Sequence, residues 1–270
     1  MSPPATVAVL AGHGKTGRAV CAALSRRGAV PRPLGREAWP DVAAALAGCA
    51  AAYLIAPNMA EDEPGYVERV LAAAGRCGLR RVVYHSVVAP YAPRMPHHLN
   101  KARAEDLVRR GAAQWTVLQP GAYVQNFVPA LAGGASVLRV PYDPRRLFGL
   151  VDLGDVAEAA AVVLLGEGHH GATYELAGPA LVSVEDVAGA ASAVLGRRVS
   201  AQRVAPEEWA AGDGAGLDPR VRDWLLAMFR YYDDHGLPAG PLPLRGLLGR
   251  DPRTLQETLA RELGRATARP

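Results

Sequence analysis

The sequence predicts an α/β protein with a doubly wound parallel sheet of the Rossmann type and a smaller, mostly helical C-terminal lobe. The first observation is that short apolar runs alternate with helical patterns as far as residue 120. Such alternation is typical of a parallel sheet with helices on both faces. The second is a glycine-rich turn, AGHGKTG, after the first apolar run. The third is a change of pattern after residue 120, where mixed segments lead into a helical tail broken by glycine and proline.

The first half of the chain supplies five expected strands and the helices between them. Short apolar runs predict buried strands at residues 7–11, 51–57, 80–88 and 114–120. Residues 29–34 form a weaker strand, because the two prolines of AVPRPL cannot donate ladder hydrogen bonds and favour a sheet edge. Helices are expected at residues 15–27, ended by Gly28, and at 41–49, 66–78 and 98–110.

The second half is more mixed. It predicts, in order, a helix at 123–131, a strand at 137–140, a helix at 155–165, a strand at 172–176, a helix at 184–195 and a strand at 199–204. Residues from 206 onward are mostly helical. We divide the chain into residues 1–135, which carry the sheet, and residues 136–270, which form a lobe interwoven with it in one compact unit.

Composition excludes several classes of protein. The chain has 270 residues and a net charge of +4, and its cations are scattered among acids. Without a basic stripe we expect no nucleic-acid partner, and without a long apolar run we expect no membrane association. The mild positive charge suits a small anionic ligand. Self-association into a homo-oligomer stays open.

The cysteines and the first residues favour a cytoplasmic protein. Cys21, Cys49 and Cys77 form no metal-type pair, and their odd number argues against a disulfide framework. The start of the chain has no basic region followed by a long apolar run, so no signal peptide is expected. His169 and His170 lack nearby ligands in a metal pattern, and we expect no metal.

Lysine is nearly absent from this chain. Among its 30 Lys and Arg residues only Lys15 and Lys101 are lysine. The alanine- and arginine-rich composition suggests a GC-rich genome, where lysine persists mainly where a compact ammonium does what a planar guanidinium cannot. Both lysines lie where a nucleotide-cofactor fold can use one.

The glycine-rich turn fits a dinucleotide site. Gly12, Gly14 and Gly17 match G-x-G-x-x-G between a strand and a helix, where glycines allow close approach to a pyrophosphate at the helix N-terminus. The alternative is a structural turn without a ligand. We therefore expect residues 1–135 to bind NAD(P) and residues 136–270 to bind substrate. The predicted pyrophosphate contacts are Gly12, His13, Gly14, Lys15, Thr16 and Gly17.

The end of the second strand favours NADP(H) over NAD(H). An NAD site usually carries an acidic residue there for the ribose hydroxyls. Here the sequence reads PRPLGRE, and Arg36, with Arg32 as a second candidate, fits a 2′-phosphate better. The neighbouring Glu37 leaves NAD(H) open, and Arg36 as a solvated loop residue is the alternative.

Several motifs occur in an order that points to one family. They are GHGKTG, YHSVVAP, PHHLNKARAEDLV, WTVLQPGAYVQN, VDLGDVAEAA, ATYELAGP and MFRYYDDHGL. On these motifs the chain resembles the NmrA-like atypical short-chain dehydrogenase/reductases. The resemblance implies a Rossmann-type fold, usually NADP(H), and either reductase chemistry or cofactor sensing. It also implies that Pro120, Gly121 and Tyr123 border the nicotinamide, and that Ala56 and Pro57 lie over the adenosine.

The expected catalytic residues depart from the superfamily pattern. Ordinary members of the wider superfamily use Tyr-x-x-x-Lys, whereas this chain has His97 four residues before Lys101. Histidine can exchange a proton near neutral pH, although His97 can equally be a loop residue at the pocket rim. Lys101 is expected to touch the nicotinamide ribose or the substrate carbonyl, so its loss should lower turnover more than stability. Ser86 matches the superfamily's serine, with a structural hydrogen bond as the alternative.

The remaining candidates concern the substrate pocket. Tyr123 and Asn126 are expected to face it, with ordinary packing as the alternative, and Trp224 and Met228 are expected to form an apolar wall. Asp152 and Asp155 resemble a carboxylate pair for acid–base work. We expect instead that Asp155 starts a helix, as a cap or first-turn acid.

These observations predict an NADPH-dependent reductase of a carbonyl, quinone or conjugated small molecule, consistent with bacterial natural-product metabolism. Hydride would pass from the nicotinamide to the substrate, and Lys101, aided by Ser86, His97 or a water, would stabilise the developing oxyanion. Two alternatives stay open. One is an NADP(H)-binding redox sensor without turnover, which the missing tyrosine favours. The other is a non-redox cyclase, dehydratase or epimerase on the same fold.

Overall fold

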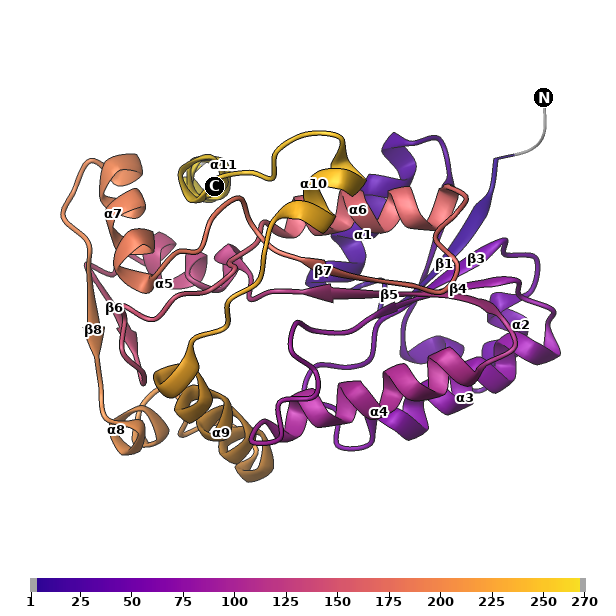
Figure 1. The fold of residues 1–270 in the computed structure, drawn as a ribbon, viewed down its shortest axis with the longest axis horizontal. Helices are drawn as coiled ribbons and strands as arrows, with labels where there is room; N and C mark the ends of the chain where they lie inside the picture. The colour runs from indigo at the N-terminus through magenta and orange to yellow at the C-terminus, as the bar shows by residue number, and fades with distance from the viewer. Residues whose placement is uncertain (1–3, 268–270) are drawn as a thin grey trace.

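The computed structural model describes residues 4–267 and contains a six-stranded parallel sheet with helices on both faces (Figure 1). The strand order is β2-β1-β3-β4-β5-β7, and every neighbouring pair runs parallel. The strands are β1 (Thr6–Leu10), β2 (Val30–Leu34), β3 (Ala51–Leu54), β4 (Arg81–His85), β5 (Gln114–Pro120) and β7 (Ala172–Leu176). The predicted α/β class with a parallel sheet is confirmed.

Helices cover the sheet in two layers. Figure 1 shows α1 (Lys15–Arg26), α6 (Leu153–Leu165) and α10 (Leu242–Leu248) above the sheet, and α2 (Val42–Leu46), α3 (Glu63–Arg76) and α4 (Pro96–Arg110) below it. Successive strand residues point to opposite faces. Val83 of β4 therefore packs in the core between the sheet and the layer of α1 and α6. The next residue, Tyr84, packs in the core between the sheet and the layer of α3 and α4.

The order of the strands places the expected ligand site. The chain passes from β1 to β2 on one side and then returns to β3 on the other side of β1. In such sheets the crevice for a ligand forms outside the carboxyl ends of the strands at this switch point. The residues that follow β1, β3, β4 and β5 are consequently the candidates for a ligand site.

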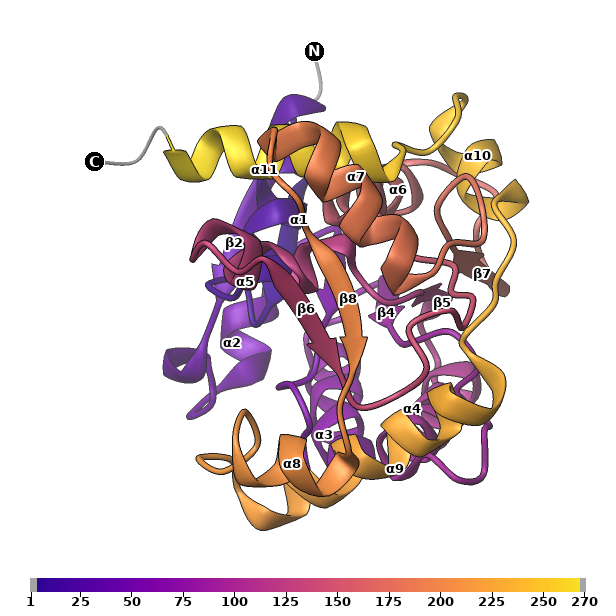
Figure 2. The same ribbon diagram turned by 90° about the vertical axis from the view of Figure 1, so that its left-hand side faces the viewer.

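A second unit lies beyond the carboxyl ends of the strands (Figures 1 and 2). It contains a two-stranded parallel sheet of β6 (Val137–Val140) and β8 (Ser200–Arg203). Its helices are α5 (Val128–Ala132), α7 (Val184–Leu195), α8 (Pro206–Ala211), α9 (Pro219–His235) and α11 (Leu255–Thr267). Helix α11 packs on α7 and α5. Although α6 and β7 belong to the second half of the sequence, they complete the large sheet and its helical layer, and the division at residue 135 stays a prediction.

Two local predictions need correction. The helix expected at 123–131 is a 3₁₀ turn, η2 (Val124–Asn126), followed by the short α5. Pro129 explains the break, because proline fits the first turn of a helix but not its interior. The strands expected at 51–57 and 80–88 end earlier, at Leu54 and His85. By contrast, the proline-containing β2 does form an edge strand, paired with β1.

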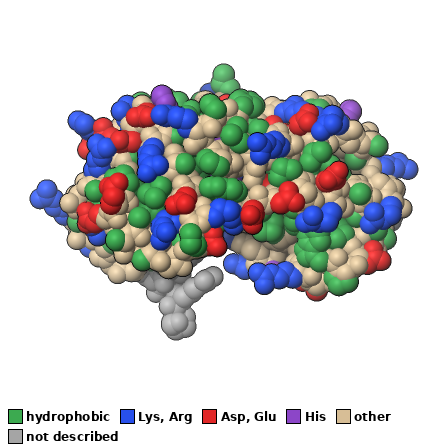
Figure 3. Space-filling model, turned by 90° about the horizontal axis from the view of Figure 1, so that it is seen from below, with side chains coloured by type: hydrophobic (Ala, Val, Ile, Leu, Met, Phe, Trp, Pro, Cys, Tyr) green, Lys and Arg blue, Asp and Glu red, His purple; other side chains and the backbone are tan. Residues whose placement is uncertain are grey.

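The surface shows no concentration of one charge on the face seen from below. Figure 3 shows Lys and Arg side chains dispersed among acidic and hydrophobic ones on that face. Within residues 4–267, no helix is long and apolar enough to cross a membrane. The same described residues contain no group of three or more His, Cys, Asp or Glu side chains able to hold a metal. All three cysteines are free thiols and half-buried.

Candidate functional site

The glycine turn joins β1 to α1 through close backbone contacts. The N–H of Gly12 donates to the Leu34 carbonyl at 3.0 Å, and that of Gly14 to the Ala11 carbonyl at 3.0 Å. A β-carbon at Gly17 would lie 2.3 Å from the Ala11 oxygen, so helix and turn can meet only if this residue is glycine. Gly14 is exposed, and a β-carbon there would meet only the Ala11 oxygen, at 3.2 Å. Gly14 thus lies at the surface of the turn, and an added β-carbon would make a single tight contact, with the Ala11 oxygen.

The N-terminus of α1 lacks a protein acceptor. Gly14 is its N-cap and supplies no side-chain hydrogen bond, and the first turn carries no acidic residue. Uncapped N–H groups and the helix dipole favour a bound anion such as a phosphate. Lys15 lies beside them, and partial burial lowers its ammonium pKa while Glu262 opposes this effect. The turn can therefore receive a pyrophosphate.

The contacts of Arg32, within β2, and of Arg36, after it, distinguish the two arginines proposed for a 2′-phosphate. Arg32 donates from Nη1 to the carbonyls of Ala45 and Ala47 at 3.0 and 2.8 Å, so its head group stabilises the end of α2. Arg36, in the 3₁₀ turn η1 (Arg36–Ala38), is exposed. Glu37 accepts from the Gly35 N–H at 2.6 Å, and backbone hydrogen bonds lower its pKa. Its carboxylate also lies 3.4 Å from Nε2 of the exposed His13, which joins this loop to the glycine turn.

Lys101 lies in a buried ion pair. Its Nζ donates to Glu63 Oε1 at 2.8 Å and to the His85 carbonyl at 3.3 Å. The Lys101 side chain is 10% exposed and that of Glu63 is 0% exposed. The Tyr84 hydroxyl donates to the same Glu63 oxygen at 2.6 Å. The ammonium thus links α4 to the first turn of α3 and to the end of β4.

Ser86 is also engaged with a buried carboxylate. Its hydroxyl donates to Glu105 Oε1 at 2.5 Å, and Gln119 Nε2 donates to the same oxygen at 2.7 Å. The other Glu105 oxygen accepts from Arg109 at 3.0 Å. These contacts hold the strand-end serine against α4 and β5.

His97 and Trp224 form the boundary between α4 and α9. Their rings lie 6.4 Å apart at 32°, and the Arg220 guanidinium stacks 4.7 Å from the Trp224 ring. His97 is buried, and burial, the Lys101 charge and His98 lower its pKa to about 3. Its Nδ1 is buried without a hydrogen-bond partner among the residues that the structure describes. His97 is therefore neutral at physiological pH.

His85 ends β4 and contacts two tyrosines. The hydroxyl of Tyr53, on β3, lies 2.6 Å from Nδ1, and the hydroxyl of Tyr123, which follows β5, lies 3.3 Å from Nε2. Burial and the Lys101 charge lower the pKa of His85 to about 3. Burial raises the pKa of Tyr123, and the side chain of Thr16 acts in the opposite direction. Through Thr16 this group reaches the glycine turn.

The other predicted positions lie along the same edge or on the lobe. Gly121 needs its lack of a side chain, because a β-carbon would lie 2.3 Å from the Gly149 oxygen. Its neighbour Pro120 is buried at the end of β5, while Asn126 in η2 is exposed. After β3, Ala56 is buried and Pro57 exposed. Met228 is half-buried and packs against the core of the lobe.

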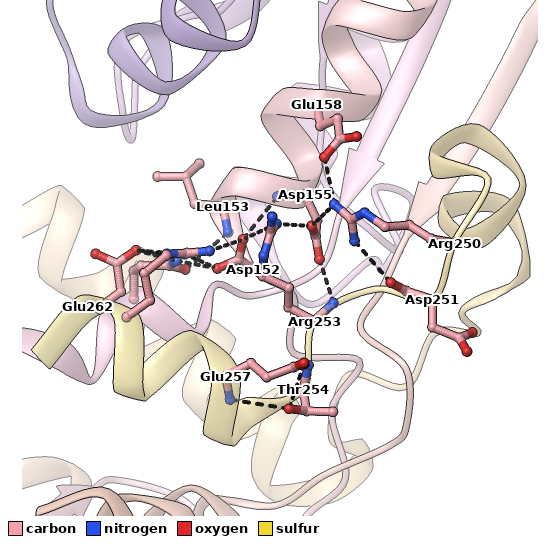
Figure 4. Close-up of polar contacts among 12 residues, drawn as sticks. Asp152, Leu153, Asp155, Glu158, Arg250, Asp251, Arg253, Thr254, Glu257 and Glu262 are labelled. Carbon is pink, nitrogen blue, oxygen red and sulfur yellow. Dashed lines mark hydrogen bonds and ion pairs between the residues drawn. The ribbon is translucent and has the colours of Figure 1, made fainter. Parts of the chain in front are cut away.

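Asp152 and Asp155 form a structural cluster, shown in Figure 4. Asp152 is the N-cap of α6 and accepts from the N–H of Asp155 at 3.0 Å. Although burial opposes it, hydrogen bonding to Arg261 helps to lower the pKa of Asp152. Asp155, fully buried in the first turn, pairs with Arg250 at 2.8 Å and with Arg253. As expected, this acid starts a helix, and it fixes the C-terminal segment to α6.

Sequence reasoning missed the partners of the predicted site residues. Glu63 follows Asp62, the N-cap of α3, and so looked like an ordinary first-turn acid. Glu105 lies within α4 among charged residues. The signal that was available is spacing: Glu105 lies four residues after Lys101, on the same side of the helix.

Comparison with curated proteins finds relatives that are named as reductases or oxidoreductases. A (4-alkanoyl-5-oxo-2,5-dihydrofuran-3-yl)methyl phosphate reductase of Streptomyces griseus is 31% identical over 157 residues, which cover 57% of this chain and about half, 54%, of that relative. Quinone oxidoreductase 2 of Escherichia coli is 24% identical over 88% of this chain and 84% of its own length.

Solved structures confirm the fold. The NADPH-dependent quinone oxidoreductase of Escherichia coli, in complex with NADPH, superposes with a TM-score of 0.81 at 21% identity, covering 94% of this chain and 99% of that one. The Rossmann-type architecture is thus shared along nearly the whole length. The NmrA-like family model matches residues 40–262, and the chain therefore belongs to the NmrA-like family.

Proposed function

We propose that this protein is an NADP(H)-dependent reductase of a carbonyl, quinone or conjugated small molecule. The observation that carries the proposal is the glycine turn, whose exposed Gly14 begins a helix with no acceptor for its first N–H groups. A dinucleotide pyrophosphate fits this environment. The names of the relatives, a dihydrofuranylmethyl phosphate reductase and a quinone oxidoreductase, support the class of reaction.

The proposed cofactor site runs along the carboxyl edge of the sheet. Gly12, His13, Gly14, Lys15, Thr16 and Gly17 would surround the pyrophosphate, and Arg36 would bind the 2′-phosphate of NADP(H). Ala56 and Pro57 would lie over the adenosine, and Pro120, Gly121 and Tyr123 would border the nicotinamide. When bound, the cofactor supplies a hydride. Tyr123, Asn126, Trp224 and Met228 would line the substrate side.

The roles of Lys101, Ser86 and His97 in catalysis stay predictions. The Lys101 ammonium and the Ser86 hydroxyl are each engaged with a buried carboxylate, Glu63 and Glu105 respectively. These contacts support positioning roles, in which both residues fix the end of β4 next to the proposed nicotinamide position. Since His97 is neutral and pairs with Trp224, it suits hydrogen bonding to substrate better than charge stabilisation.

The same contacts favour one alternative, an NADP(H)-binding sensor that does not turn over. A reductase needs donors directed at the oxygen where charge develops, and two of the expected donors point at protein carboxylates instead. The sensor would keep the cofactor site and lack turnover with any acceptor, so a binding assay and a turnover assay together separate the two functions.

The first experiment is a binding titration with NADPH and NADH on the same preparation. We expect NADPH to bind at least tenfold more tightly, and Arg36→Gln to remove most of that difference. Arg26→Gln, at an exposed arginine in the last turn of α1, is the matched control and should leave both affinities unchanged. Equal affinities in the unmodified protein would refute the NADP(H) preference, and no binding of either would refute the site.

Turnover is then tested with quinones and conjugated carbonyls, following NADPH oxidation. Product formation would support the reductase, and tight binding without oxidation by any acceptor would support the sensor.

We also propose a cytoplasmic location, which suits the three free thiols. Light scattering of the same sample tests whether the protein is a homo-oligomer.

A further inference from the structure

Three side chains from three neighbouring strands form a hydrogen-bonded chain at the carboxyl edge of the sheet. Tyr53 on β3 contacts His85 at the end of β4, and His85 contacts Tyr123 just after β5. Their exposure decreases inward: Tyr123 is half-buried, His85 is 8% exposed and Tyr53 is 0% exposed. The Tyr53 end of this hydrogen-bonded series therefore lies in the core, and the Tyr123 end lies at the carboxyl edge of the sheet, along which the proposed cofactor site runs.

The buried end determines where the protons lie. Within the described residues, the Tyr53 hydroxyl has one hydrogen-bond partner, Nδ1 of His85. A buried hydroxyl proton without an acceptor is costly, so Tyr53 donates and Nδ1 accepts. A neutral imidazole carries its single proton on the other nitrogen. His85 consequently donates from Nε2 to the Tyr123 oxygen. The side-chain hydrogen bond of Thr16 lowers the pKa of Tyr123, so Thr16 donates to the same oxygen. The Tyr123 proton therefore points away from both partners.

The imidazole stays neutral, so this arrangement does not change near physiological pH. Burial and the Lys101 charge lower the pKa of His85 to about 3. A protonated ring would donate from both nitrogens and would turn the Tyr53 hydroxyl into an acceptor. With a neutral ring, the direction of both hydrogen bonds is set by Tyr53 alone.

We propose that Tyr53 and His85 hold the Tyr123 hydroxyl as a directed hydrogen-bond donor. Its acceptor is the carbonyl oxygen of a substrate bound at the nicotinamide end of the proposed cofactor site. The proposal rests on the proposed function for the identity of the ligand, since Tyr123 borders the nicotinamide only if the dinucleotide binds along this edge. Tyr123 then supplies the donor that the missing tyrosine of the Tyr-x-x-x-Lys pattern would have provided. Tyr53 and His85 are positioning residues in this account.

The chain orients a donor and does not carry protons. Burial raises the pKa of Tyr53 well above its ordinary value, so withdrawing its proton would leave an anion in the apolar core. Burial also raises the pKa of Tyr123. The Tyr123 hydroxyl thus keeps its proton and polarises the carbonyl through a hydrogen bond, as the donors of an oxyanion hole do.

A double-mutant cycle on Tyr53 and Tyr123 tests the proposal. Tyr123→Phe should lower kcat for quinone reduction about 100-fold, the usual effect of removing one such donor. Tyr53→Phe lets His85 adopt either tautomer and should lower kcat about 3- to 10-fold, with the KM for NADPH within about twofold, as the loss of one directed hydrogen bond does. In the Tyr123→Phe background, Tyr53→Phe should have no further effect, because both changes act through the same hydroxyl.

Tyr142→Phe provides the matched control. Tyr142 is a buried tyrosine in the aromatic cluster of the lobe, so its variant measures the loss of a buried hydroxyl away from the proposed site. It should leave kcat unchanged. Losses of kcat that multiply in the double variant, or an equal loss in Tyr142→Phe, would overturn the proposal.

A measurement without turnover separates this inference from the proposed function. ¹⁵N NMR of the histidine rings, with His85→Gln for assignment, should show His85 protonated on Nε2 at neutral pH and a mixture of tautomers in Tyr53→Phe. A ring protonated on Nδ1 would overturn the inference even in an active reductase. If the Nε2 tautomer is found but no acceptor is reduced, the reductase function and the donor role fail together, while the hydrogen-bonded order of Tyr53, His85 and Tyr123 is supported.

Discussion

Replacing Lys101 with methionine is expected to destabilise the protein severely. The ammonium is 10% exposed and lies 2.8 Å from Glu63, which is 0% exposed. Methionine keeps most of the apolar stem and removes the charge, so the buried carboxylate retains only the Tyr84 hydroxyl among its described side-chain partners. Removing one member of a buried ion pair costs about 3–5 kcal/mol. For a chain of this size, such a loss lowers Tm by about 6–20 °C.

Urea unfolding followed by circular dichroism measures this cost. Lys15→Met is the matched control, because it removes the exposed lysine and should change the unfolding free energy by less than about 0.5 kcal/mol. The double variant Lys101→Met/Glu63→Gln should recover part of the loss. Glutamine carries no charge, and its side-chain oxygen still accepts from Tyr84.

A small effect would refute the reasoning. If Lys101→Met unfolds within about 1 kcal/mol of the unmodified protein, the ion pair does not stabilise the fold, and the ammonium is free to act at the ligand site. That result would restore the expectation drawn from the sequence alone, in which Lys101 matters for turnover more than for stability.

The remaining predictions concern the turn, the C-terminal segment and pH. Gly17→Ala should lower the unfolding free energy by about 3 kcal/mol, because its methyl group overlaps the turn. Gly14→Ala should instead fold normally and bind NADPH at least tenfold more weakly. Equal stabilities of the two variants would contradict this contrast. Asp155→Asn should lower the unfolding free energy by about 2–3 kcal/mol, since its arginine partners are partly exposed. Backbone hydrogen exchange of residues 250–262 should also accelerate in this variant. Unchanged exchange would show that the cluster does not hold that segment. Acid should also destabilise the protein through His85, His97 and His98, whose pKa values are lowered by burial. Between about pH 6.5 and 4 these histidines bind protons in the unfolded chain but not in the native state, which costs about 1.4 kcal/mol of stability per pH unit for each one. A urea midpoint that stays constant between pH 7 and 5 would contradict their burial.

Local patterns predicted most of the fold. The alternation of apolar runs and helices located the five strands of the first half, and even the edge position of β2 followed from its two prolines. Position within the sheet was harder to predict. β7 lies far along the chain but pairs with β5, and such non-local pairing leaves no trace in the local pattern.

The candidate site could be read from the sequence where it depends on backbone geometry, and less so where it depends on side-chain partners. The glycine turn could be identified because close approach demands glycine, as Gly17 shows. The partners of Lys101 and Ser86 could not, because Glu63 and Glu105 come from other turns of the chain and look like surface acids in the sequence. Lysine scarcity singled out Lys101, which lies in a buried ion pair with Glu63; its role in turnover stays a prediction.

The arginines that meet Asp152 and Asp155 have a consequence for the order of events during synthesis. Both carboxylates are buried at the start of α6, and the cations that compensate them come from Arg250, Arg253 and Arg261. A nascent chain that has emerged only through β7 holds every strand of the large sheet but none of these cations. β7 ends at Leu176 and the last of these arginines is Arg261. Native packing of α6 must therefore wait until the chain has emerged as far as this arginine, and chains truncated before residue 250 should be degraded rather than accumulate.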